Sequence, residues 1–419
     1  MTLAWISLIA LGVVVVLSCT NRVHPGFLAI ALAFLIGMVI APAYGVQLQL
    51  RRDILSGFPV DLFLTLTGVS LLFTQAHLNG TLDRVSHAAV KLCRGNVGLI
   101  PWMFFVLSAA FATAGAGNIA AAALMAPTAM AIASKARIPG TLMTLLVGHG
   151  SIAGALSPIS PTGLIAERQM TDIGLAGHAS VMFGHNLLIN VVVAIVAFVL
   201  FGGMRLFTRR YDAEVPVEEA RFEARHWATL AVIAGLLLST LFLDVDVGMG
   251  AFVCAVLLAL TGIADDTDAI KQMPWSVILM VCGVNVLTAL LRHRDIGGTS
   301  LFADLIVRVA SAESAPAILG FVSAVVSVYS STSGVVLPAF LPMVKDVAER
   351  LPDSDPLGLA LAVIVAGHLV DSSPLSTIGA LCVASAGAEE NRRALFTTTL
   401  LWGLGMSVVG ALWCWVLYG

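Results

Sequence analysis

Apolar residues occur along this chain in runs that are long enough to cross a lipid bilayer. Residues 3–17, 27–39 and 191–201 are almost uninterrupted apolar stretches, and similar runs continue to the C-terminus. A membrane-spanning helix needs about 20 mostly apolar residues, whereas barrel strands are shorter and alternate. The pattern therefore predicts an all-α integral membrane protein. No basic residue precedes the first run, so we expect a retained helix there and not a cleaved signal peptide.

One long polar stretch divides the chain into two halves. Residues 205–226 hold five Arg and five acidic residues, and we interpret them as a cytoplasmic linker. The parts on either side, 1–204 and 227–419, match each other at a shift of about 215 residues. The matching segments are Phe58-Pro59 with Met273-Pro274, Thr67-Gly-Val-Ser70 with Cys282-Gly-Val-Asn285, Ala126-Pro127 with Leu341-Pro342, and Ser157-Pro-Ile-Ser160 with Ser373-Pro-Leu-Ser376. The chain is predicted to contain two repeats.

Each half contains an apolar segment that a polar, Gly-containing stretch interrupts. In the first half, 97–111 and 119–132 flank Thr113-Ala-Gly-Ala-Gly-Asn118. In the second half, 318–328 and 335–344 flank Ser330-Ser-Thr-Ser-Gly334. Arms of about 15 residues or fewer are too short to cross the bilayer. Irregular backbone at that depth is tolerated where it is buried in protein or lines a cavity. We therefore predict a re-entrant helical hairpin in each half, at about 97–134 and 315–345.

The charges around the two hairpins predict opposite orientations. The first hairpin is flanked mainly by basic residues, whereas acidic residues outnumber basic ones after the second. Because basic residues favour the cytoplasm, the first hairpin is expected to enter from inside and the second from outside. This requires about five transmembrane helices in each of two inverted-topology repeats, with both termini periplasmic or extracellular. The expected spans are near 3–20, 26–44, 60–78, 140–165, 181–205, 227–243, 247–264, 275–291, 357–380 and 394–418.

The helix that follows each hairpin, at about 140–165 and 357–380, contains a proline-rich break. The breaks lie at 157–163 and 371–379. Proline removes a backbone donor and clashes with the preceding turn, so these stretches should unwind. Freed carbonyl groups can then coordinate a cation, while nearby helix N-termini attract an anion. Two hairpin tips and two broken helices would meet at mid-membrane, as expected for the site of a secondary transporter.

The tips and breaks supply the candidate site residues. The candidates for substrate binding are Gly117, Asn118, Ser157, Ser160, Thr162, Thr332, Ser333, Ser376 and Thr377. The candidates for cation binding or coupling are Thr113, Asn118, Ser331, Ser333, Asp371 and Ser373. The alternative is that these small residues merely let helices pack closely. The tips contain no Lys or Arg, so a carboxylate would be held by hydroxyl groups, amides and helix dipoles.

Three ionisable residues lie within or beside the expected spans, where charge is costly and usually functional. Asp371 stands beside an unwound Ser-Ser-Pro and could bind Na⁺ or carry a proton. His149 and His368 follow a Gly in both halves and are candidates for proton or substrate contact. The alternative for each His is a neutral ring that is bonded to a backbone carbonyl.

Composition narrows the function classes further. The chain is 58% hydrophobic and 11% charged with a net charge of −3, which offers no basic surface for nucleic acid. Its six Cys are scattered without CxxC spacing and are best read as buried small residues. No HExxH, Gly-x-Ser-x-Gly or nucleotide-binding loop is present, so we expect neither an enzyme nor a bound cofactor. A channel stays open as an alternative.

At the tips and breaks the chain resembles the ion transporter superfamily, particularly its divalent anion/sodium symporters and the malonate/dicarboxylate carrier branch. The family's tips read Ser-Asn-Thr ten positions before a Pro. Here Gly117-Asn-Ile119 stands ten residues before Pro127, and Thr332-Ser-Gly334 ten before Pro342. The family's Pro-Val-Ala-Thr resembles Pro374-Leu-Ser-Thr377, and its Thr-Pro-Ile-Gly is similar to Ser157-Pro-Ile-Ser160.

The resemblance implies a homodimer in the bacterial inner membrane that works by an elevator motion. It implies substrate contacts at Asn118, Thr332, Ser333 and Thr377, with cation sites near both tips. We therefore expect cation-coupled symport of a C3 or C4 dicarboxylate such as malonate or succinate. The alternatives are transport of another anion (a sulfonate, phosphonate or monocarboxylate) and Na⁺/H⁺ antiport. Because the full Ser-Asn-Thr pairs are absent, coupling to H⁺ through Asp371 or a His is the alternative to Na⁺.

Overall fold

The computed structural model describes residues 2–18, 22–91, 93, 96–210, 222–243, 245–386 and 390–419. Within these residues the chain forms helices and short loops, together with an isolated bridge between Asn96 and Arg210. Residues 211–221 of the predicted linker lie outside the described residues, as do Cys19 and Arg94. The prediction of an all-α fold is confirmed for the part of the chain that is described.

The first half begins with long helices and ends with a hairpin, a broken helix and a further long helix. Its elements are α1 (Thr2–Ser18), α2 (Pro25–Leu35), α3 (Ala41–Ala43), α4 (Val60–Leu78), α5 (Thr81–Lys91), α6 (Leu99–Phe111), α7 (Gly117–Ala136), α8 (Gly140–Gly154), α9 (Pro161–Asp172) and α10 (Ala179–Leu200).

The second half follows the same order. Its elements are α11 (Ala224–Leu243), α12 (Val247–Leu260), α13 (Asp266–Gln272), α14 (Trp275–Arg292), α15 (Gly298–Val307), α16 (Ala315–Tyr329), a short π-helix at Thr332–Val336, α17 (Leu337–Phe340), α18 (Val344–Arg350), α19 (Pro356–Leu369), α20 (Thr377–Ala384) and α21 (Arg392–Tyr418).

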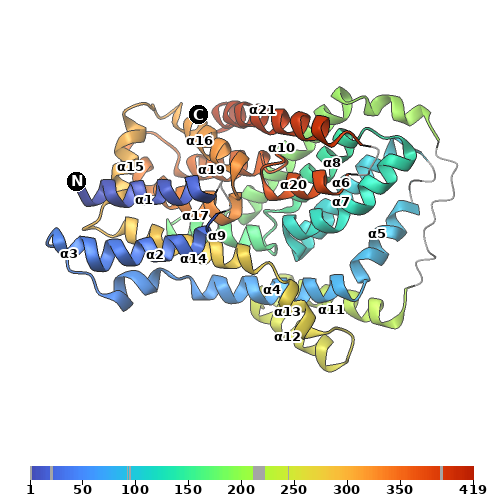
Figure 1. Ribbon diagram of the computed structural model, residues 1–419, viewed down its shortest axis with the longest axis horizontal. Coiled ribbons are helices and arrows are strands. Elements are labelled where there is room, and N and C mark those ends of the chain that lie inside the picture. Colours follow the sequence, from blue (N-terminus) through green and yellow to red (C-terminus); the bar gives the residue numbers. More distant parts are fainter. Residues whose placement is uncertain are drawn as a thin grey trace.

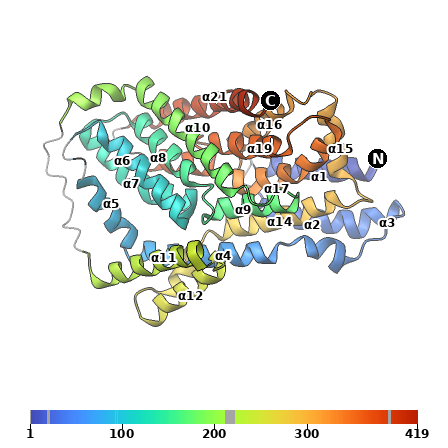
Figure 2. The same cartoon turned by 180° about the vertical axis from the view of Figure 1, so that it is seen from behind.

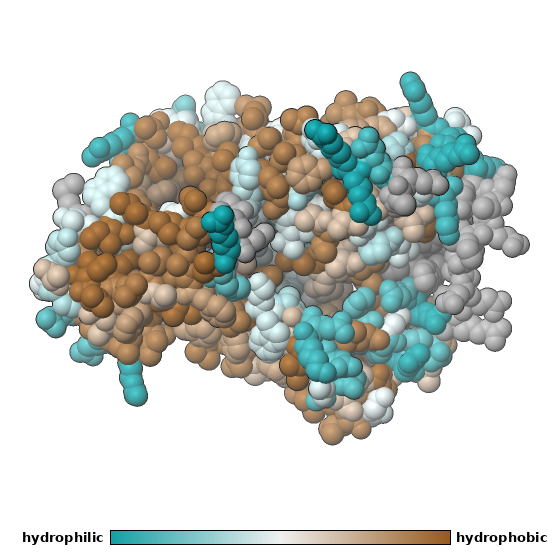
Figure 3. All heavy atoms as spheres, viewed as in Figure 1, coloured by the Kyte–Doolittle hydropathy of each residue, from teal (hydrophilic) through white to brown (hydrophobic). Residues whose placement is uncertain are grey.

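Several helices are long and apolar enough to cross a membrane. Among the described residues, six helical stretches meet this requirement: Pro25–Ala43, Leu50–Leu78, Leu99–Ala136, Ala179–Leu200, Trp275–Arg292 and Arg392–Tyr418. Large apolar side chains are also exposed, for example Phe27 at 56% and Leu260 at 79%. Figure 3 shows apolar side chains covering most of the end formed by α1, α2 and α3, whereas hydrophilic ones gather around α13. Such a surface suits lipid and not water.

The structure corrects the expected lengths of two segments. The second arm of the first hairpin, α7, has 20 residues instead of about 15, because the helix begins at Gly117 within the tip and continues through Ser134 and Lys135 to Ala136. Conversely, the span expected at 247–264 contains a helix of only 14 residues, since α12 ends at Leu260 and a turn at Gly262 (φ 68°) follows. Length alone therefore did not distinguish the hairpin arms from the spans.

The two hairpins reach the centre of the molecule from opposite ends (Figures 1 and 2). α6 and α7 extend inward from the end that holds α5, and α16 extends inward from the end that holds α15. The broken helices lie between them, and nearly every residue of α8 and α19 is buried. A helix that is apolar on all sides belongs in the interior of a large helical protein. The tips and breaks are therefore held by the most deeply packed elements.

Two helices of each half pack against helices of the other half. α2 lies along α14, and α12 lies along α4. Around the hairpins, α6 packs on α8, and α16 packs on both α19 and α21. The molecule thus contains a group of long helices (α2, α4, α12 and α14) beside a group that carries the tips and breaks. The candidate site lies where the two groups meet.

Candidate functional site

The first hairpin turns at two glycines with positive φ, which bring Asn118 to the start of α7. Gly115 has φ 120° and Gly117 has φ 79°, conformations that side-chain-bearing residues rarely adopt. The Asn118 Oδ1 accepts hydrogen bonds from the Ile119 N–H at 3.0 Å and from the Thr162 hydroxyl at 3.3 Å. Its Nδ2 makes no hydrogen bond within the described residues. This amide nitrogen is therefore available as a hydrogen-bond donor.

The break between α8 and α9 is held by serine hydroxyls that bond to freed backbone groups. Ser157 donates to the Thr113 carbonyl at 2.8 Å, which ties the break to the first tip. Ser160 accepts from the Gly163 N–H at 3.1 Å and donates to the carbonyls of Ala155 and Ser157, which follow α8. Both serine side chains are buried. Ser157 and Ser160 thus position the break, and their hydroxyls are already engaged.

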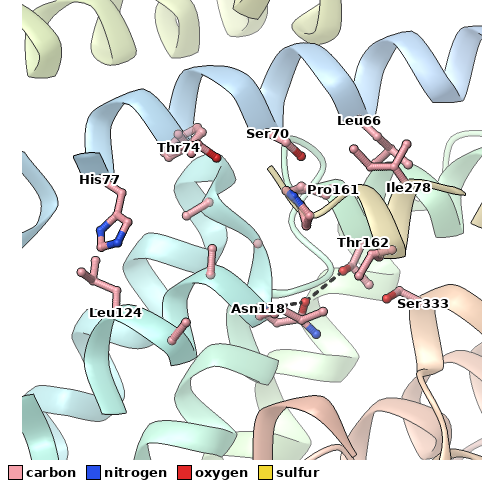
Figure 4. Close-up of a pocket in the computed structure, with 18 of the residues that line it drawn as sticks. Leu66, Ser70, Thr74, His77, Asn118, Leu124, Pro161, Thr162, Ile278 and Ser333 are labelled. Carbon is pink, nitrogen blue, oxygen red and sulfur yellow. Dashed lines mark hydrogen bonds between the residues drawn. The ribbon is translucent and has the colours of Figure 1, made fainter. Parts of the chain in front are cut away.

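A first cavity of about 320 Å³ joins the two tips and the first break. Of the predicted residues, Gly117, Asn118, Thr162 and Ser333 line it. Its opposite wall is made by α4 and by the start of α14 (Figure 4). The first turns of α7 and α9 both face this cavity. Helix N-termini carry free N–H groups and partial positive charge, so this wall suits an anion.

The second tip and second break enclose a buried carboxylate. Asp371 is 4% exposed, and its Oδ1 lies 2.6 Å from the hydroxyl of Thr332 and 3.1 Å from those of Ser327 and Ser376. No Lys, Arg or His forms an ion pair with Asp371 in the described part of the chain. The Asp371 Oδ2 accepts no hydrogen bond there either. A buried carboxylate in this setting is stable when it carries a proton or holds a cation.

Ser331 and Ser373, two further predicted residues of the second half, form hydrogen bonds with backbone N–H groups. The Ser331 hydroxyl accepts from the Gly334 N–H at 3.1 Å, and the Ser373 hydroxyl accepts from the Leu375 N–H at 3.3 Å. The Asp371 carbonyl accepts from the Gly379 N–H at 3.3 Å, which closes the break. The role of each of these residues as a ligand stays a prediction.

A second cavity of about 600 Å³ lies on the other side of the start of α14. Of the predicted residues, Ser331, Ser376 and Thr377 line it. It shares no lining residue with the first cavity. The predicted substrate-binding residues are therefore divided between two chambers and do not surround one.

The two histidines make hydrogen bonds away from both cavities. His149 bonds through Nδ1 to the Asn190 Oδ1 at 2.9 Å, and its Nε2 accepts from the Trp402 indole N–H at 2.9 Å. This arrangement defines a neutral ring. The His368 Nδ1 bonds to the Ile364 carbonyl at 2.7 Å, and its buried Nε2 has no partner within the described residues. Neither ring lines the first or the second cavity. His368 is bonded to a backbone carbonyl, as the alternative expects, whereas His149 is bonded to two side chains. A proton or substrate contact for either ring stays a prediction.

Sequence reasoning missed a polar stripe on α4. Ser70, Thr74 and His77 line the first cavity opposite Asn118. Their spacing of four and three residues places them on one face of a helix. That spacing within an otherwise apolar span was the signal that could have revealed them. His77 is also the one titratable side chain among the described residues that line this cavity.

The described residues contain no group of three or more His, Cys, Asp or Glu that could hold a metal ion. The oxygens around Asp371 come from hydroxyl groups and one carboxylate. Oxygen ligands of this kind suit a hard cation better than a soft one.

A comparison with known protein families found a match for the first part of the chain. Residues 1–155 match a family model described as the N-terminus of the dicarboxylate carrier protein MatC. The matched part runs from α1 to the end of α8 and includes the first tip. It supports the resemblance to the malonate/dicarboxylate carrier branch, and with it a membrane carrier instead of an enzyme. No curated protein matches the chain.

Proposed function

We propose that this chain is a secondary transporter that carries C3 or C4 dicarboxylates, such as malonate or succinate, together with a cation. The observation that carries the proposal is the first cavity, where the starts of α7 and α9 converge with Asn118, Thr162 and Ser333. Amide and hydroxyl donors at helix N-termini bind carboxylates without a fixed positive charge. The match of residues 1–155 to a dicarboxylate carrier family supports this substrate class.

The proposed coupling group is Asp371. A dianion that enters an uncharged cavity brings two negative charges into a region of low dielectric, where they are costly. A cation that is carried in the same cycle offsets part of that charge. Asp371, surrounded by the hydroxyls of Ser327, Thr332 and Ser376, offers the place for it. The coupling ion in this proposal is Na⁺ or H⁺.

The architecture suggests how the site would reach both sides of the membrane. The two hairpins enter from opposite ends of the molecule. Two inverted repeats in a protein of the bacterial inner membrane would require this arrangement. We propose that the group carrying the tips and breaks moves as an elevator past α2, α4, α12 and α14. In this proposal those four helices form the static scaffold of a homodimer, and both termini lie outside.

A second candidate is Na⁺/H⁺ antiport, which the buried Asp371 favours. An antiporter needs one carboxylate that binds either ion in turn, and it needs no organic anion. Ion exchange that proceeds at full rate without a dicarboxylate would therefore favour this alternative over symport.

The test is uptake of radiolabelled malonate and succinate by the purified protein in liposomes, with an inward Na⁺ gradient, an inward H⁺ gradient or neither. We expect saturable uptake that depends on one gradient. Asn118→Ala should weaken substrate affinity by about 10- to 100-fold, since it removes a hydrogen bond to a charged group. The matched control is Asn391→Ala, which removes the side-chain cap of α21 away from the cavity. Absence of uptake of both acids under every gradient, with folded protein in the vesicles, would exclude this substrate class.

A further inference from the structure

The two cavities are separate and are lined by different chemistry. The first is faced by the starts of α7 and α9, and Asn118 and Thr162 are among its lining residues. Seven of the fifteen residues that line the second carry a hydroxyl group, and one is a histidine, His24, whose Nε2 lies 3.2 Å from the Ser276 Oγ. The hydroxyl-bearing residues are Ser18, Ser276, Tyr329, Ser330, Ser331, Ser376 and Thr377. A hydroxyl-rich wall offers oxygen ligands and a chain of hydrogen bonds, both of which suit a small cation or a proton.

α14 forms the partition between the two chambers. Its Val277 and Ile278 line the first cavity, whereas Ser276 and Met280 line the second. Residues four apart lie on one face of a helix, and residue 277 points to a different face from 276 and 280. Adjacent positions on one rigid helix thus face different chambers.

The second break connects the second cavity to Asp371 through one hydroxyl group. Ser376 lines the cavity and donates to the Asp371 Oδ1 at 3.1 Å. The first cavity has no lining residue that bonds to Asp371. Of the two cavities, the second is therefore the one whose lining is hydrogen-bonded to Asp371.

We propose that the second cavity is a separate access route by which a small monovalent cation or proton reaches Asp371, while the dicarboxylate uses the first cavity. This inference rests on the proposed function in taking Asp371 as the coupling group. In this arrangement the ion and the substrate enter on opposite sides of α14. Blocking one route leaves the other open.

Two adjacent positions on α14 provide a matched pair for testing this separation. Ser276 faces the second cavity and Val277 the first, and neither side chain is fully buried. In Ser276→Cys and Val277→Cys, a benzyl methanethiosulfonate adds the same bulky group to either chamber. The parent protein treated with the same reagent shows the effect of labelling its own Cys residues. Thr377→Cys is a second position in the hydroxyl-lined cavity if Ser276→Cys does not fold.

Three quantities are measured on the purified protein: the rate of ²²Na⁺ binding, the rate of proton uptake after an acid pulse, and the Kd for succinate. We expect the label at 276 to slow binding of one of the two cations at least fivefold and to leave the succinate Kd within twofold. The label at 277 should instead raise the succinate Kd at least fivefold and leave both cation rates within twofold. The cation whose rate falls is the coupling ion, and Asp371→Asn should abolish binding of that cation.

The inference is overturned if the label at 276 weakens succinate binding and leaves both cation rates unchanged, because the second cavity would then belong to the substrate route. It is equally overturned if Asp371→Asn retains full cation binding. The cation measurements need no organic anion. If no variant binds succinate, the proposed substrate fails, while the cation rates still decide whether the second cavity serves Asp371.

Discussion

The two breaks share a backbone design but differ in their chemistry. Ser157, Ser160 and Gly163 in the first correspond to Ser373, Ser376 and Gly379 in the second, each at a shift of 216 residues (373−157, 376−160 and 379−163). At the same shift, Ala155 stands where the second break has Asp371, and Thr162 stands where it has Ile378. Thr162, which faces the first cavity, and the buried Asp371 thus each have an apolar counterpart in the other half.

This difference shows that the same kind of helix break can have a different hydrogen-bonding role in each half. In the first break Ser160 donates to backbone carbonyls, one of them that of Ala155. In the second, the equivalent Ser376 donates to the Asp371 carboxylate. Meanwhile Ile378 is buried against Ala122 of the first hairpin, which makes that side of the second break apolar. We infer that the first break serves the substrate and the second the coupling ion.

The largest expected effect concerns what the breaks share. A Cβ on residue 163 would lie 1.9 Å from the Ser157 carbonyl oxygen, and one on residue 379 would lie 2.1 Å from that of Ser373. Gly163→Ala and Gly379→Ala should each destabilise the protein by about 3 kcal/mol, the upper part of the usual range for overpacking. Thermal unfolding in detergent measures this.

The matched control for both variants is Gly405→Ala, because a Cβ at this helical position would meet no atom within 4 Å. Its melting temperature should equal or exceed that of the parent. If Gly163→Ala or Gly379→Ala also melts like the parent, the close backbone approach at that break is wrong.

The next effect should separate the two breaks. Asp371→Asn keeps the shape of the side chain but removes the charge that a cation or proton would neutralise. We expect gradient-driven accumulation of succinate to fall to the level of empty liposomes, while succinate still binds at the first cavity. Uptake and equilibrium binding are measured on the same preparation. The control, Asp246→Asn, alters an exposed helix cap and should transport normally. Normal accumulation by Asp371→Asn would assign coupling elsewhere.

The smallest expected effects come from removing a single hydroxyl group near each break. Thr162→Val and Thr332→Val each remove one hydroxyl with little change in volume, and each loss costs about 1 kcal/mol, or roughly fivefold. Thr162→Val should raise the succinate KM at saturating cation, since Thr162 lines the first cavity. Thr332→Val should instead shift the cation concentration for half-maximal uptake, because its hydroxyl bonds to Asp371. Equal effects of both variants on both quantities would contradict the division of roles.

Local sequence signals predicted much of the site. Gly115 and Gly117 marked the first turn, and the Ser-Pro pairs at 157 and 373 marked the breaks, because these residues restrict the backbone wherever they occur. Signals that depend on distant partners were less informative. His149 attracted interest as an ionisable residue in an apolar span, but Asn190 and Trp402 satisfy both of its ring nitrogens. Its partners come from α10 and α21, which no local pattern connects to α8.

The sequence by itself determined an all-α membrane protein, a hairpin tip and a helix break in each half, and a lone carboxylate beside the second break. These features follow from hydrophobic run length and from the backbone preferences of Gly and Pro, which act over a few residues. Only the tertiary structure decided which polar residues share a cavity. It placed Asn118, Thr162 and Ser333 together, and it set Ser376 and Thr377 on the far side of α14. The reason is that a cavity is enclosed by helices far apart in the chain, so its lining depends on how they pack.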